Sequence, residues 1–391
     1  MGYRYAVIGA GRQGIAAAYD MAKYGEAEQV LLVDVDATAA KEAAERVNRL
    51  LSEPLATGVH ADATNTDQLM SVLNGVSAIL SAVPYSYNLR LTEVAIRLGS
   101  SMCDLGGHTG IVREQLKLDD RARTAGVTIV PDCGMGPGMS ISLAGYAMSL
   151  VERPREVYIW DGGLPQDPQP PWNYALTFNV GGLTNEYYGN AYFLRGGEIT
   201  EVPCFEGFEE LEFPPPLGRL EAAVTSGGLS TAPWTFEGKL ERLENRTLRY
   251  PGHWTQFKAY AQLGLLELEP VQVGDRQIVP RDVFHALLEP KIVQPEIRDV
   301  CVIRTKCVGE TGGRRAKAVV ELIDYYDEST GFTAMQRLTG WHASIVAILA
   351  AQGRVAKGAV SVELAVSGPV MVREARRRGF DIQESVTQID T

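Results

Sequence analysis

The stretch Ala6-Val7-Ile8-Gly9-Ala10-Gly11-Arg12-Gln13-Gly14 decides how the chain begins to fold. Its first residues are apolar and predict a β-strand, and the residues after Gly11 predict the start of a helix. In this Gly-x-Gly-x-x-Gly spacing, Gly9 permits a tight turn, Gly11 lets the backbone approach a pyrophosphate, and Gly14 lets the helix pack close to the sheet. The first turn of such a helix presents unpaired N–H groups to an anion. We therefore expect the chain to begin with a domain that binds a dinucleotide.

Asp34 ends the next predicted strand, Val30–Asp34, and lies twenty residues after Gly14. A carboxylate at this place accepts hydrogen bonds from the adenosine ribose and repels a 2′-phosphate, so we expect the cofactor to be NAD rather than NADP. In the alternative interpretation, Asp34 only caps the following helix. Arg12 could reach a phosphate, and this leaves NADP open.

Residues 1–136 alternate apolar strands with amphipathic helices, a pattern typical of an α/β fold with a doubly wound parallel sheet of the Rossmann type. The third strand is predicted to end near Asp62 and the fourth at Val83, which Pro84 follows. Because the carboxyl ends of parallel strands line the ligand crevice, we expect Asp62 to contact the adenine, with helix capping as the alternative. The nicotinamide half should pass Val83 and Pro84. The predicted cofactor site comprises Gly9, Gly11, Arg12, Gln13, Gly14, Asp34, Asp62, Val83 and Pro84.

The pattern changes after Pro137, where Gly138–Val151 predicts an apolar helix that leaves the first domain. Strands interrupted by Gly and Pro follow, among them Tyr158–Asp161 and Tyr174–Val180, and they predict an α+β domain over residues 137–337. We expect this domain to supply the pocket for a small polar substrate. Residues 338–391 predict a helical segment that packs back on the Rossmann domain.

The composition argues against several classes of function. A net charge of −11 disfavours a nucleic-acid partner, because phosphate binding needs clustered Lys and Arg. The five cysteines and five histidines show neither a Cys-x-x-Cys pair nor zinc spacing, so we expect no metal, and reduced thiols in a cytoplasmic protein. The N-terminus leads directly into the first strand, and no apolar run reaches the roughly 18 residues of a membrane span. We therefore expect neither a signal peptide nor a membrane segment.

Several uncommon motifs follow one another along the chain. They are AVIGAGRQG (residues 6–14), AVPYSYN (82–88), MCDLGG (102–107), IVPDCGMGPGMS (129–140), GLTNEYYG (182–189), TSGGLSTAPWTFEGK (225–239), TLRYPGH (247–253) and MQRLTGW (335–341). With these motifs the chain resembles the saccharopine dehydrogenase family and, within it, the lysine 6-dehydrogenase branch. Gly136 stands before Pro137-Gly138 where the saccharopine enzymes usually carry Asp, and this difference points to the lysine branch.

The resemblance implies an enzyme that binds NAD or NADP and oxidises or forms a C–N bond at an amino acid side chain. It also implies a homodimer, with the middle domain making much of the interface. For the lysine branch it implies oxidative deamination of the L-lysine side chain to 2-aminoadipate 6-semialdehyde, which cyclises to piperideine-6-carboxylate, with release of ammonia. A dehydrogenase or reductase of saccharopine, or a dehydrogenase of a carboxylated polyamine, is the first alternative. A dinucleotide-binding regulator without turnover is the second, although the TLRYPGH and GGLSTAP segments argue against it.

A lysine-type substrate presents a carboxylate, which calls for Arg, and a side-chain amine, which calls for a base. Arg249 in TLRYPGH suits the carboxylate, and a structural ion pair is its alternative role. Tyr250 beside it could assist in binding or could serve packing. Ser230 and Thr231 could offer hydroxyl and backbone groups to the substrate.

Two residues are candidate catalytic bases. His253 ends TLRYPGH and could take a proton near neutral pH, whereas a hydrogen-bonded structural histidine is the alternative. Asp104 ends the fifth predicted strand and faces the crevice by topology, with a role in the turn as the alternative. Glu186 and Tyr187 in GLTNEYYG lie either near the substrate or at the dimer contact.

Overall fold

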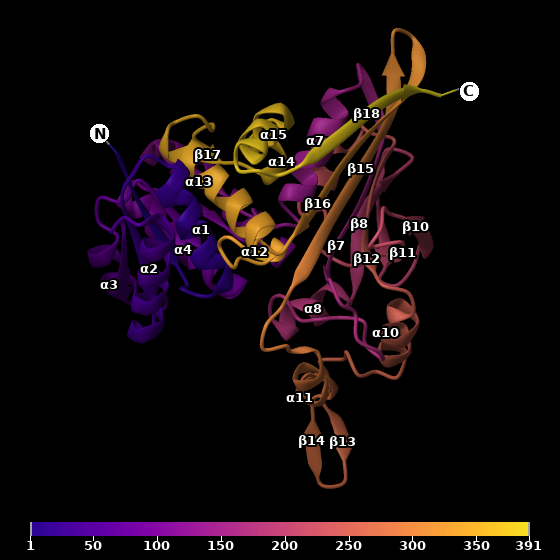
Figure 1. Cartoon of the computed structure of the whole chain (residues 1–391), viewed down its shortest axis with the longest axis horizontal. Coiled ribbons are helices and arrows are strands. Elements are labelled where there is room, and N and C mark those ends of the chain that lie inside the picture. The colour runs from indigo at the N-terminus through magenta and orange to yellow at the C-terminus, as the bar shows by residue number, and fades with distance from the viewer. Residues whose placement is uncertain (1, 390–391) are drawn as a thin grey trace. The chain divides into compact units, whose positions relative to one another are not determined.

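The structure is a computed structural model that describes residues 2–389 (Figure 1). The contacts between residues divide the chain into two compact units. Each unit is assembled from segments that are far apart in the sequence. Unit 1 contains the residues up to Ser149, Ser230–Thr235 and Asp327–Phe380, and unit 2 contains Leu150–Leu229, Phe236–Tyr326 and the residues from Asp381.

Unit 1 contains a parallel β-sheet with the strand order β17-β6-β5-β4-β1-β2-β3. Without β17 this is the 3-2-1-4-5-6 order of the Rossmann fold, so the predicted doubly wound sheet is confirmed. The strand order reverses between β1 and β4, which is where such sheets bind their ligands. The strands are β1 (Tyr3–Ile8), β2 (Ala27–Asp34), β3 (Ala56–His60), β4 (Ala78–Ser81), β5 (Ser101–Asp104), β6 (Thr128–Val130) and β17 (Gly358–Ala359).

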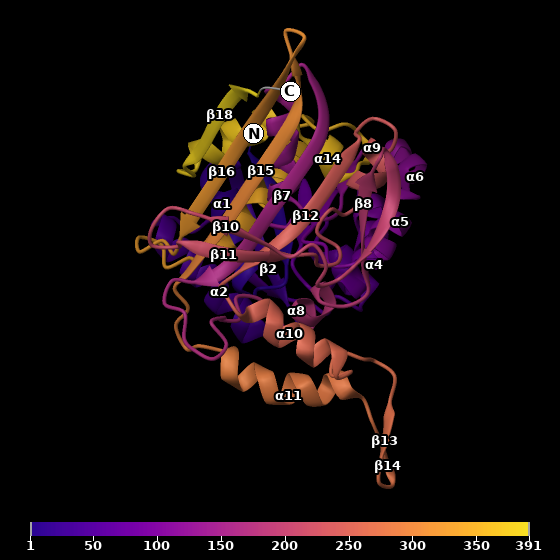
Figure 2. The same cartoon turned by 90° about the vertical axis from the view of Figure 1, so that its right-hand side faces the viewer.

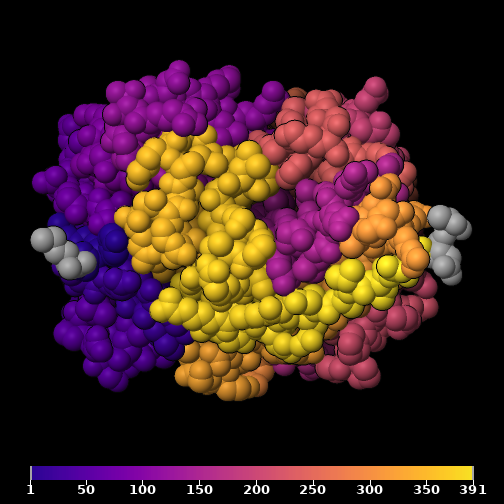
Figure 3. Space-filling model, turned by 90° about the horizontal axis from the view of Figure 1, so that it is seen from above, coloured from indigo at the N-terminus to yellow at the C-terminus, as the bar shows by residue number. Residues whose placement is uncertain are grey.

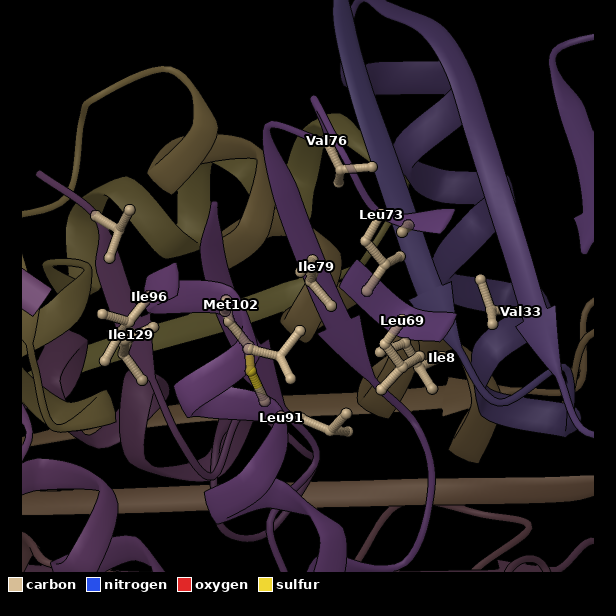
Figure 4. Close-up of a cluster of buried hydrophobic side chains, with 14 of the residues drawn as sticks. Ile8, Val33, Leu69, Leu73, Val76, Ile79, Leu91, Ile96, Met102 and Ile129 are labelled. Atoms are coloured by element: carbon tan, nitrogen blue, oxygen red, sulfur yellow. The ribbon is translucent and has the colours of Figure 1, made fainter. Parts of the chain in front are cut away.

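Helices cover both faces of this sheet. On one face, apolar side chains of the strands pack against α3, α4 and α6 in a continuous core (Figure 4). On the other face lies α13, which is buried on every side and whose Ala343 carbonyl accepts a hydrogen bond of 3.3 Å from the Cys103 thiol. The helices of unit 1 are α1 (Arg12–Tyr24), α2 (Ala37–Leu51), α3 (Thr66–Val72), η1 (Tyr85–Tyr87), α4 (Asn88–Leu98), α5 (Thr109–Leu116), α6 (Asp119–Ala125), α7 (Met139–Ser149), α12 (Ala334–Gln336), η2 (Arg337–Trp341), α13 (His342–Ala351), α14 (Val362–Ala365) and α15 (Gly368–Arg377).

Unit 1 extends beyond the predicted boundary at residue 136. Helix α7 packs against α14 and α15, and most of its residues are buried. The sequence predicts that this helix leaves the first domain. In the structure it belongs to that domain, because an apolar helix needs cover on more than one side.

The C-terminal segment first completes unit 1. It supplies α13 and α15, and β17 pairs with β6 at the edge of the parallel sheet. Figure 3 shows these residues in yellow against the indigo N-terminal residues of the same unit. The prediction of a helical segment is wrong at the end of the chain, where β18 (Ile382–Gln388) is a strand that pairs with β16 in unit 2. Only Ile382 of this edge strand is buried, so its sequence lacks the apolar alternation that reveals a strand.

Unit 2 contains a mixed nine-stranded sheet in which β12 runs parallel to β7 and antiparallel to β8 and β11 (Figure 2). A separate hairpin, β13–β14, lies between α10 and α11 in the sequence. The remaining elements of unit 2 are β7 (Arg153–Pro165), α8 (Val180–Glu186), β8 (Asn190–Arg195), β9 (Glu198–Pro203), β10 (Glu209–Glu212), β11 (Arg219–Ala223), β12 (Arg242–Arg249), α10 (His253–Gln262), β13 (Val271–Val273), β14 (Arg276–Ile278), α11 (Pro280–Ile292), β15 (Asp299–Thr311) and β16 (Arg314–Tyr325). Helix α9 (Ala232–Phe236) lies mostly in the segment Ser230–Thr235 of unit 1.

The predicted strand at Tyr174–Val180 is wrong. Residues 173–176 have no regular secondary structure, and α8 begins at Val180 after the side chain of Asn179, which caps it by accepting a hydrogen bond from the Gly182 N–H. Asn commonly ends an extended segment in this way, because its side chain satisfies an N–H group of the first helical turn.

Candidate functional site

The glycine-rich turn of unit 1 leaves no room for side chains at two of its three glycines. Gly9 has a φ of +104°, and a Cβ there would lie 2.6 Å from the carbonyl oxygen of Ala82. A Cβ on Gly14 would lie 1.9 Å from the carbonyl oxygen of Gly9. Gly11 precedes α1 without a side-chain cap, and nothing lies within 4 Å of a Cβ built on it. The free N–H groups of the first turn thus border open space, and a pyrophosphate fits there.

Both carboxylate oxygens of Asp34 hold backbone groups at the end of β2. Oδ2 accepts a hydrogen bond from the Ala10 N–H at 2.8 Å, and Oδ1 accepts one from the Asp36 N–H at 3.0 Å. The alternative role of Asp34 as a helix cap is wrong, because Asp36 caps α2. Asp34 is partly exposed, and each carboxylate oxygen retains a lone pair that can accept a hydrogen bond from a ribose hydroxyl.

The first turn of α1 is braced by the MQRLTGW motif. Gln336 donates a hydrogen bond of 2.8 Å from Nε2 to the carbonyl oxygen of Arg12. Gly340, in η2, approaches α1 so closely that a Cβ would lie 2.9 Å from the carbonyl oxygen of Gln13. The side chain of Arg12 is exposed and that of Gln13 is half-buried. The motif therefore positions the helix that would hold the cofactor phosphates.

Asp62 follows β3 and organises a turn. Its Oδ1 accepts a hydrogen bond from the Thr64 N–H at 2.8 Å, and this bond lowers the pKa of the Asp62 carboxyl. Its alternative role as a helix cap is wrong, because the side chain of Asn65 caps α3. A contact of Asp62 with adenine remains a prediction.

Val83 and Pro84 follow β4 at the same edge of the sheet. Val83 lies beside the glycine-rich turn, since its Cγ1 would be 3.2 Å from a Cβ on Gly9, and Pro84 is exposed. The next residue, Tyr85, stacks on the ring of His108 with 5.3 Å between ring centroids. The loops after β4 and β5 thus meet where the nicotinamide half is expected.

Asp104 ends β5 and is 1% exposed. Its Oδ1 accepts hydrogen bonds from the N–H groups of Gly106, at 2.8 Å, and Asp132, at 3.1 Å, while Oδ2 accepts one from Gln115 Nε2 at 2.8 Å. Burial raises the pKa of the Asp104 carboxyl, and these hydrogen bonds lower it. Both oxygens are engaged in holding the loops after β5 and β6, as the turn interpretation expects.

Asp132 lies just after β6, and sequence reasoning missed it. It is 2% exposed, and its φ of +61° lies in the left-handed region. Burial and the nearby Asp104 raise the pKa of the Asp132 carboxyl to about 7, whereas the Ser230 hydroxyl and the Gly107 N–H lower it. The signal that selects Asp104, an acidic residue at the end of a predicted strand, would also have found Asp132.

Ser230 and Thr231 belong to unit 1 and not to the domain over residues 137–337 in which the sequence placed them. Thr231 Oγ1 donates a hydrogen bond of 3.0 Å to Glu363 on α14. The guanidinium of Arg113 lies over the ring of Trp234, 5.1 Å from its centroid. These contacts explain why a short segment between two parts of unit 2 packs with the dinucleotide-binding unit.

Arg249 ends β12 within a buried polar cluster of unit 2, here called the Arg249 cluster: Tyr174, Glu186, Tyr187, Arg249 and His253. Arg249 Nε donates a hydrogen bond of 2.9 Å to the Tyr187 hydroxyl, and Nη2 lies 3.6 Å from Glu186 Oε2. The Arg249 side chain is 3% exposed, whereas that of Glu186 is 32% exposed. Burial raises the pKa of the Glu186 carboxyl to about 7, although the charge of Arg249 lowers it. The structure thus brings GLTNEYYG and TLRYPGH together.

His253 begins α10 and is 1% exposed. Its Nε2 lies 2.8 Å from the Tyr187 hydroxyl, and its ring stacks on Phe257 with 4.1 Å between centroids. Burial and the charge of Arg249 hold the pKa of His253 well below its usual value, so the imidazole stays neutral. Tyr250, from the same motif, donates a hydrogen bond of 3.0 Å to the Pro165 carbonyl and packs in the hydrophobic core of unit 2.

Among residues 2–389, no group of three or more His, Cys, Asp or Glu side chains is placed to hold a metal ion. No described helix is both long enough and apolar enough to cross a membrane. All five cysteines are free thiols.

Two family models match consecutive parts of the chain. The model described as the saccharopine dehydrogenase NADP binding domain matches residues 5–130, and the model described as the saccharopine dehydrogenase C-terminal domain matches residues 134–378. Together they cover the described part of the chain almost completely.

Three curated proteins are similar to the chain at 22–23% identity. They are the alpha-aminoadipic semialdehyde synthase of Arabidopsis thaliana (23%, 68% of this chain), the NADP(+), L-glutamate-forming saccharopine dehydrogenase of Saccharomyces cerevisiae (22%, 43%) and the carboxynorspermidine synthase of Vibrio alginolyticus (22%, 68%). The aligned region spans 26%, 39% and 66% of these relatives' own lengths, respectively.

One solved structure has the same fold over nearly the whole chain. It is the apo saccharopine dehydrogenase (L-Glu forming) of Saccharomyces cerevisiae, with a TM-score of 0.78 and 17% identity, and the superposition covers 99% of this chain and 100% of that one.

Proposed function

Since this chain belongs to the saccharopine dehydrogenase family, we propose that it is an NAD-dependent dehydrogenase that oxidises the side-chain amine of L-lysine. The product would be 2-aminoadipate 6-semialdehyde, which closes on its own α-amine to piperideine-6-carboxylate. We also propose that it acts as a homodimer in the cytoplasm.

The glycine-rich turn supports dinucleotide binding. The backbone around Gly11 would hold the pyrophosphate, and Asp34 would hold the adenosine ribose. The family model and the yeast relative are described with NADP. We nevertheless propose NAD, because the charge of Asp34 would repel a 2′-phosphate. The bound cofactor would supply the hydride acceptor.

The observation that carries the choice of substrate is the pair formed by Arg249 and Glu186. Their charged groups lie 3.6 Å apart, a longer separation than a tight charge-assisted hydrogen bond. A positive and a negative group side by side complement the carboxylate and the α-ammonium of an amino acid. Arg249 would bind the carboxylate through Nη2, because Nε donates to the Tyr187 hydroxyl and Nη1 to the Leu248 carbonyl, and Glu186 would bind the ammonium. The Tyr187 hydroxyl, held between Arg249 and His253, fixes the orientation of the guanidinium.

The reaction requires that the protein remove a proton from the substrate. A side-chain ammonium has no lone pair with which to form a C=N bond, so one proton must leave before hydride departs from the neighbouring carbon. Departure of hydride leaves an iminium, C=N, at this carbon. Water then adds to the iminium carbon, and the nitrogen leaves as ammonia. One lysine, one NAD⁺ and one water give one aldehyde, one NADH, one ammonium ion and one proton. His253 and Asp104 are the two bases that the sequence proposes.

Oxidation of saccharopine or of a carboxylated polyamine is the second candidate, and it is supported by the names of the curated relatives. Those substrates carry more carboxylates and would need more cations than Arg249, which already faces Glu186. A regulator without turnover would have no use for the Arg249 cluster.

An amine screen with the purified protein tests the proposal. L-Lysine with NAD should yield NADH, followed by absorbance, and an equal amount of ammonia. Activity should rise toward alkaline pH as the amine loses its proton. Turnover of saccharopine but not of lysine would overturn the substrate while leaving the family assignment intact. Absence of turnover with every amine would favour the regulator.

A further inference from the structure

Two residues of unit 1 that are not glycine adopt left-handed backbone conformations while buried. Asp132 has a φ of +61° and is 2% exposed, and Ser230 has a φ of +48° and is 4% exposed. Such conformations are uncommon for residues with a side chain, and they persist when the surrounding structure fixes them. Asp132 and Ser230 come from segments about one hundred residues apart, yet the Ser230 hydroxyl interacts with the Asp132 carboxyl.

Each of these side chains has a buried oxygen that makes no hydrogen bond of normal geometry among the described residues, although the Ser230 hydroxyl lies close enough to the Asp132 carboxyl to lower its pKa. The oxygens are Asp132 Oδ1 and Ser230 Oγ, each with almost no contact with solvent. Burying a polar atom without a partner costs free energy, so native proteins rarely leave one unsatisfied away from a ligand or a water site. Two such atoms on neighbouring side chains indicate a place where a polar group binds.

The contrast with Asp104 identifies which carboxyl is available. Both oxygens of Asp104 accept hydrogen bonds from the protein, and one of these donors is the backbone N–H of Asp132. Asp104 therefore positions Asp132. The carboxyl of Asp132 itself packs over Gly106, where a Cβ would lie 2.1 Å from Oδ1, so the loop after β5 leaves space for this carboxyl only because residue 106 is glycine.

The location of the pair fits the crevice of the parallel sheet. Asp132 follows the carboxyl end of β6, on the side of the sheet beyond β4 and β5, where the second half of a dinucleotide lies in this topology. Ser230 is held in unit 1 by its neighbour Thr231, which donates to Glu363. The hydrogen bond of Thr231 and the packing of Trp234 under Arg113 thus fix the Ser230 hydroxyl with respect to Asp132.

We propose that Asp132 is the catalytic base that receives the proton of the substrate ammonium, and that Ser230 is a positioning residue that orients the Asp132 carboxylate. This inference rests on the proposed amine oxidation and replaces Asp104 and His253 as the base. In the step, the N–H bond of the ammonium breaks, its electron pair stays on nitrogen, and the proton is transferred to the Asp132 carboxylate. The neutral amine then has the lone pair from which the C=N bond forms.

The charges around Asp132 suit this role. Asp104 on β5 and Glu363 on α14 raise its pKa together with burial, and the Ser230 hydroxyl and the Gly107 N–H lower it, with a resulting pKa of about 7. The adjacent Cys133 thiol is buried, and its pKa is raised, so it adds no negative charge near neutral pH. A base is most effective when its pKa lies near the working pH.

Variants at three positions test the assignment with L-lysine and NAD. Asp132→Asn suits the backbone, because Asn tolerates the left-handed region. We expect its turnover to fall by about 10²–10⁴-fold while NADH binding stays within about twofold of wild type. Asp132→Glu should recover part of the activity. Ser230→Ala should shift the acid limb of the kcat/KM profile to higher pH, because the lost hydroxyl no longer stabilises the carboxylate. Turnover of Asp132→Asn close to that of wild type would overturn the assignment.

A second measurement does not depend on turnover. Burial raises the pKa of Glu186 to about 7 as well, so infrared difference spectra of the protein with NADH should show carboxylic acid C=O absorption from two groups that titrate near pH 7. Asp132→Asn should remove only one of these two contributions. Asp104→Asn is the control, and it should keep a titrating band shifted to lower pH, since a neighbouring negative charge has been removed. A titrating band in Asp132→Asn as strong as that of wild type would overturn the role of Asp132 even if lysine is the substrate. If the band is weaker in Asp132→Asn but lysine is not oxidised by wild type, the proposed substrate fails while Asp132 remains a titrating acid.

Discussion

The carboxylate of Asp34 accepts a hydrogen bond of 2.8 Å from the backbone N–H of Ala10, inside the glycine-rich turn. A second backbone donor, the Asp36 N–H, holds the other oxygen. The acceptor for the ribose is thus fixed in place before any cofactor binds, and its position is tied to the backbone that would hold the pyrophosphate. Preorganisation of this kind reduces the entropy that ligand binding costs.

The first prediction concerns the choice between cofactors. Wild-type protein should prefer NAD over NADP by tenfold or more, which corresponds to one charged hydrogen bond of about 1.5–3 kcal/mol. Asp34→Asn keeps an acceptor for the Ala10 N–H but removes the charge, so most of the preference should disappear. Asp36→Asn is the matched control, because Asn caps α2 as well as Asp does. Steady-state kinetics with NAD and with NADP measure this preference. An equal or better kcat/KM of wild type with NADP would contradict the role of Asp34 in cofactor choice.

The second prediction separates two glycines of the same turn. Gly11→Ala places a methyl group in open space, so the protein should melt at nearly the wild-type temperature but bind NADH at least tenfold more weakly. Gly14→Ala places a methyl group 1.9 Å from the Gly9 carbonyl oxygen, so it should lower the melting temperature itself. Fluorescence titration and thermal melting measure the two effects. Unchanged NADH affinity in Gly11→Ala would show that the pyrophosphate does not lie over this turn.

The third prediction concerns Arg249. Replacement by Ala leaves the buried Tyr187 hydroxyl without its donor and the partly exposed Glu186 without its cation, and the loss of a buried hydrogen-bond partner costs about 1–3 kcal/mol of stability. The folded fraction should also use lysine far less efficiently while its affinity for NADH is retained. Arg155→Ala is the control, since Arg155 pairs with Glu241 and Glu310 at the surface and exposed pairs contribute about 0–1 kcal/mol each. A destabilised variant with normal kcat/KM for lysine would assign Arg249 a purely structural role.

The fourth prediction concerns acid stability. Burial depresses the pKa of His253 below its unfolded value, so the unfolded chain binds the extra proton. The stability that the neutral imidazole contributes is therefore complete above the unfolded pKa of about 6.5 and is lost as the pH falls below it, by up to about 1.4 kcal/mol per pH unit. His253→Gln keeps a polar group for the Tyr187 hydroxyl but cannot take up the proton. Its free energy of unfolding should depend less steeply on pH between 6.5 and 5 than that of wild type. Urea unfolding across this range measures the slope, and the exposed His60→Gln should leave it unchanged.

Much of unit 1 could be predicted because its signals are local. The apolar runs that give β1, β2, β4 and β5 are bounded by helices with clear periodicity. The spacing between Gly14 and Asp34 equals the length of one helix and one strand of the βαβ unit. The C-terminal segment, residues 338–391, was harder to predict. α13 is apolar on all sides and has a helical signal, whereas β18 exposes nearly all of its side chains and is held by backbone pairing with β16.

The candidate site was only partly predictable, since long-range contacts decide it. TLRYPGH and GLTNEYYG could each be recognised, but the distance of 3.6 Å between Arg249 and Glu186 depends on how β12 and α8 pack. The sequence placed Ser230 in the second domain, because nothing in its neighbourhood reveals the hydrogen bond from Thr231 to Glu363 about 130 residues later. An acidic residue at the end of a predicted strand is a signal that Asp132 shares with Asp104, and only the hydrogen bonds that occupy Asp104 show which of the two carboxyls is available.

The discontinuous assembly of unit 1 has a consequence for biosynthesis. The ribosome releases the chain from the N-terminus, and domains usually fold as they emerge. Here β1 to β6 leave the ribosome long before α13, which covers β4 and β5 with a helix that is apolar on every side. A nascent chain that ends before residue 342 therefore carries an uncovered apolar sheet face, and it would be a substrate for chaperones until residues 342–351 are made.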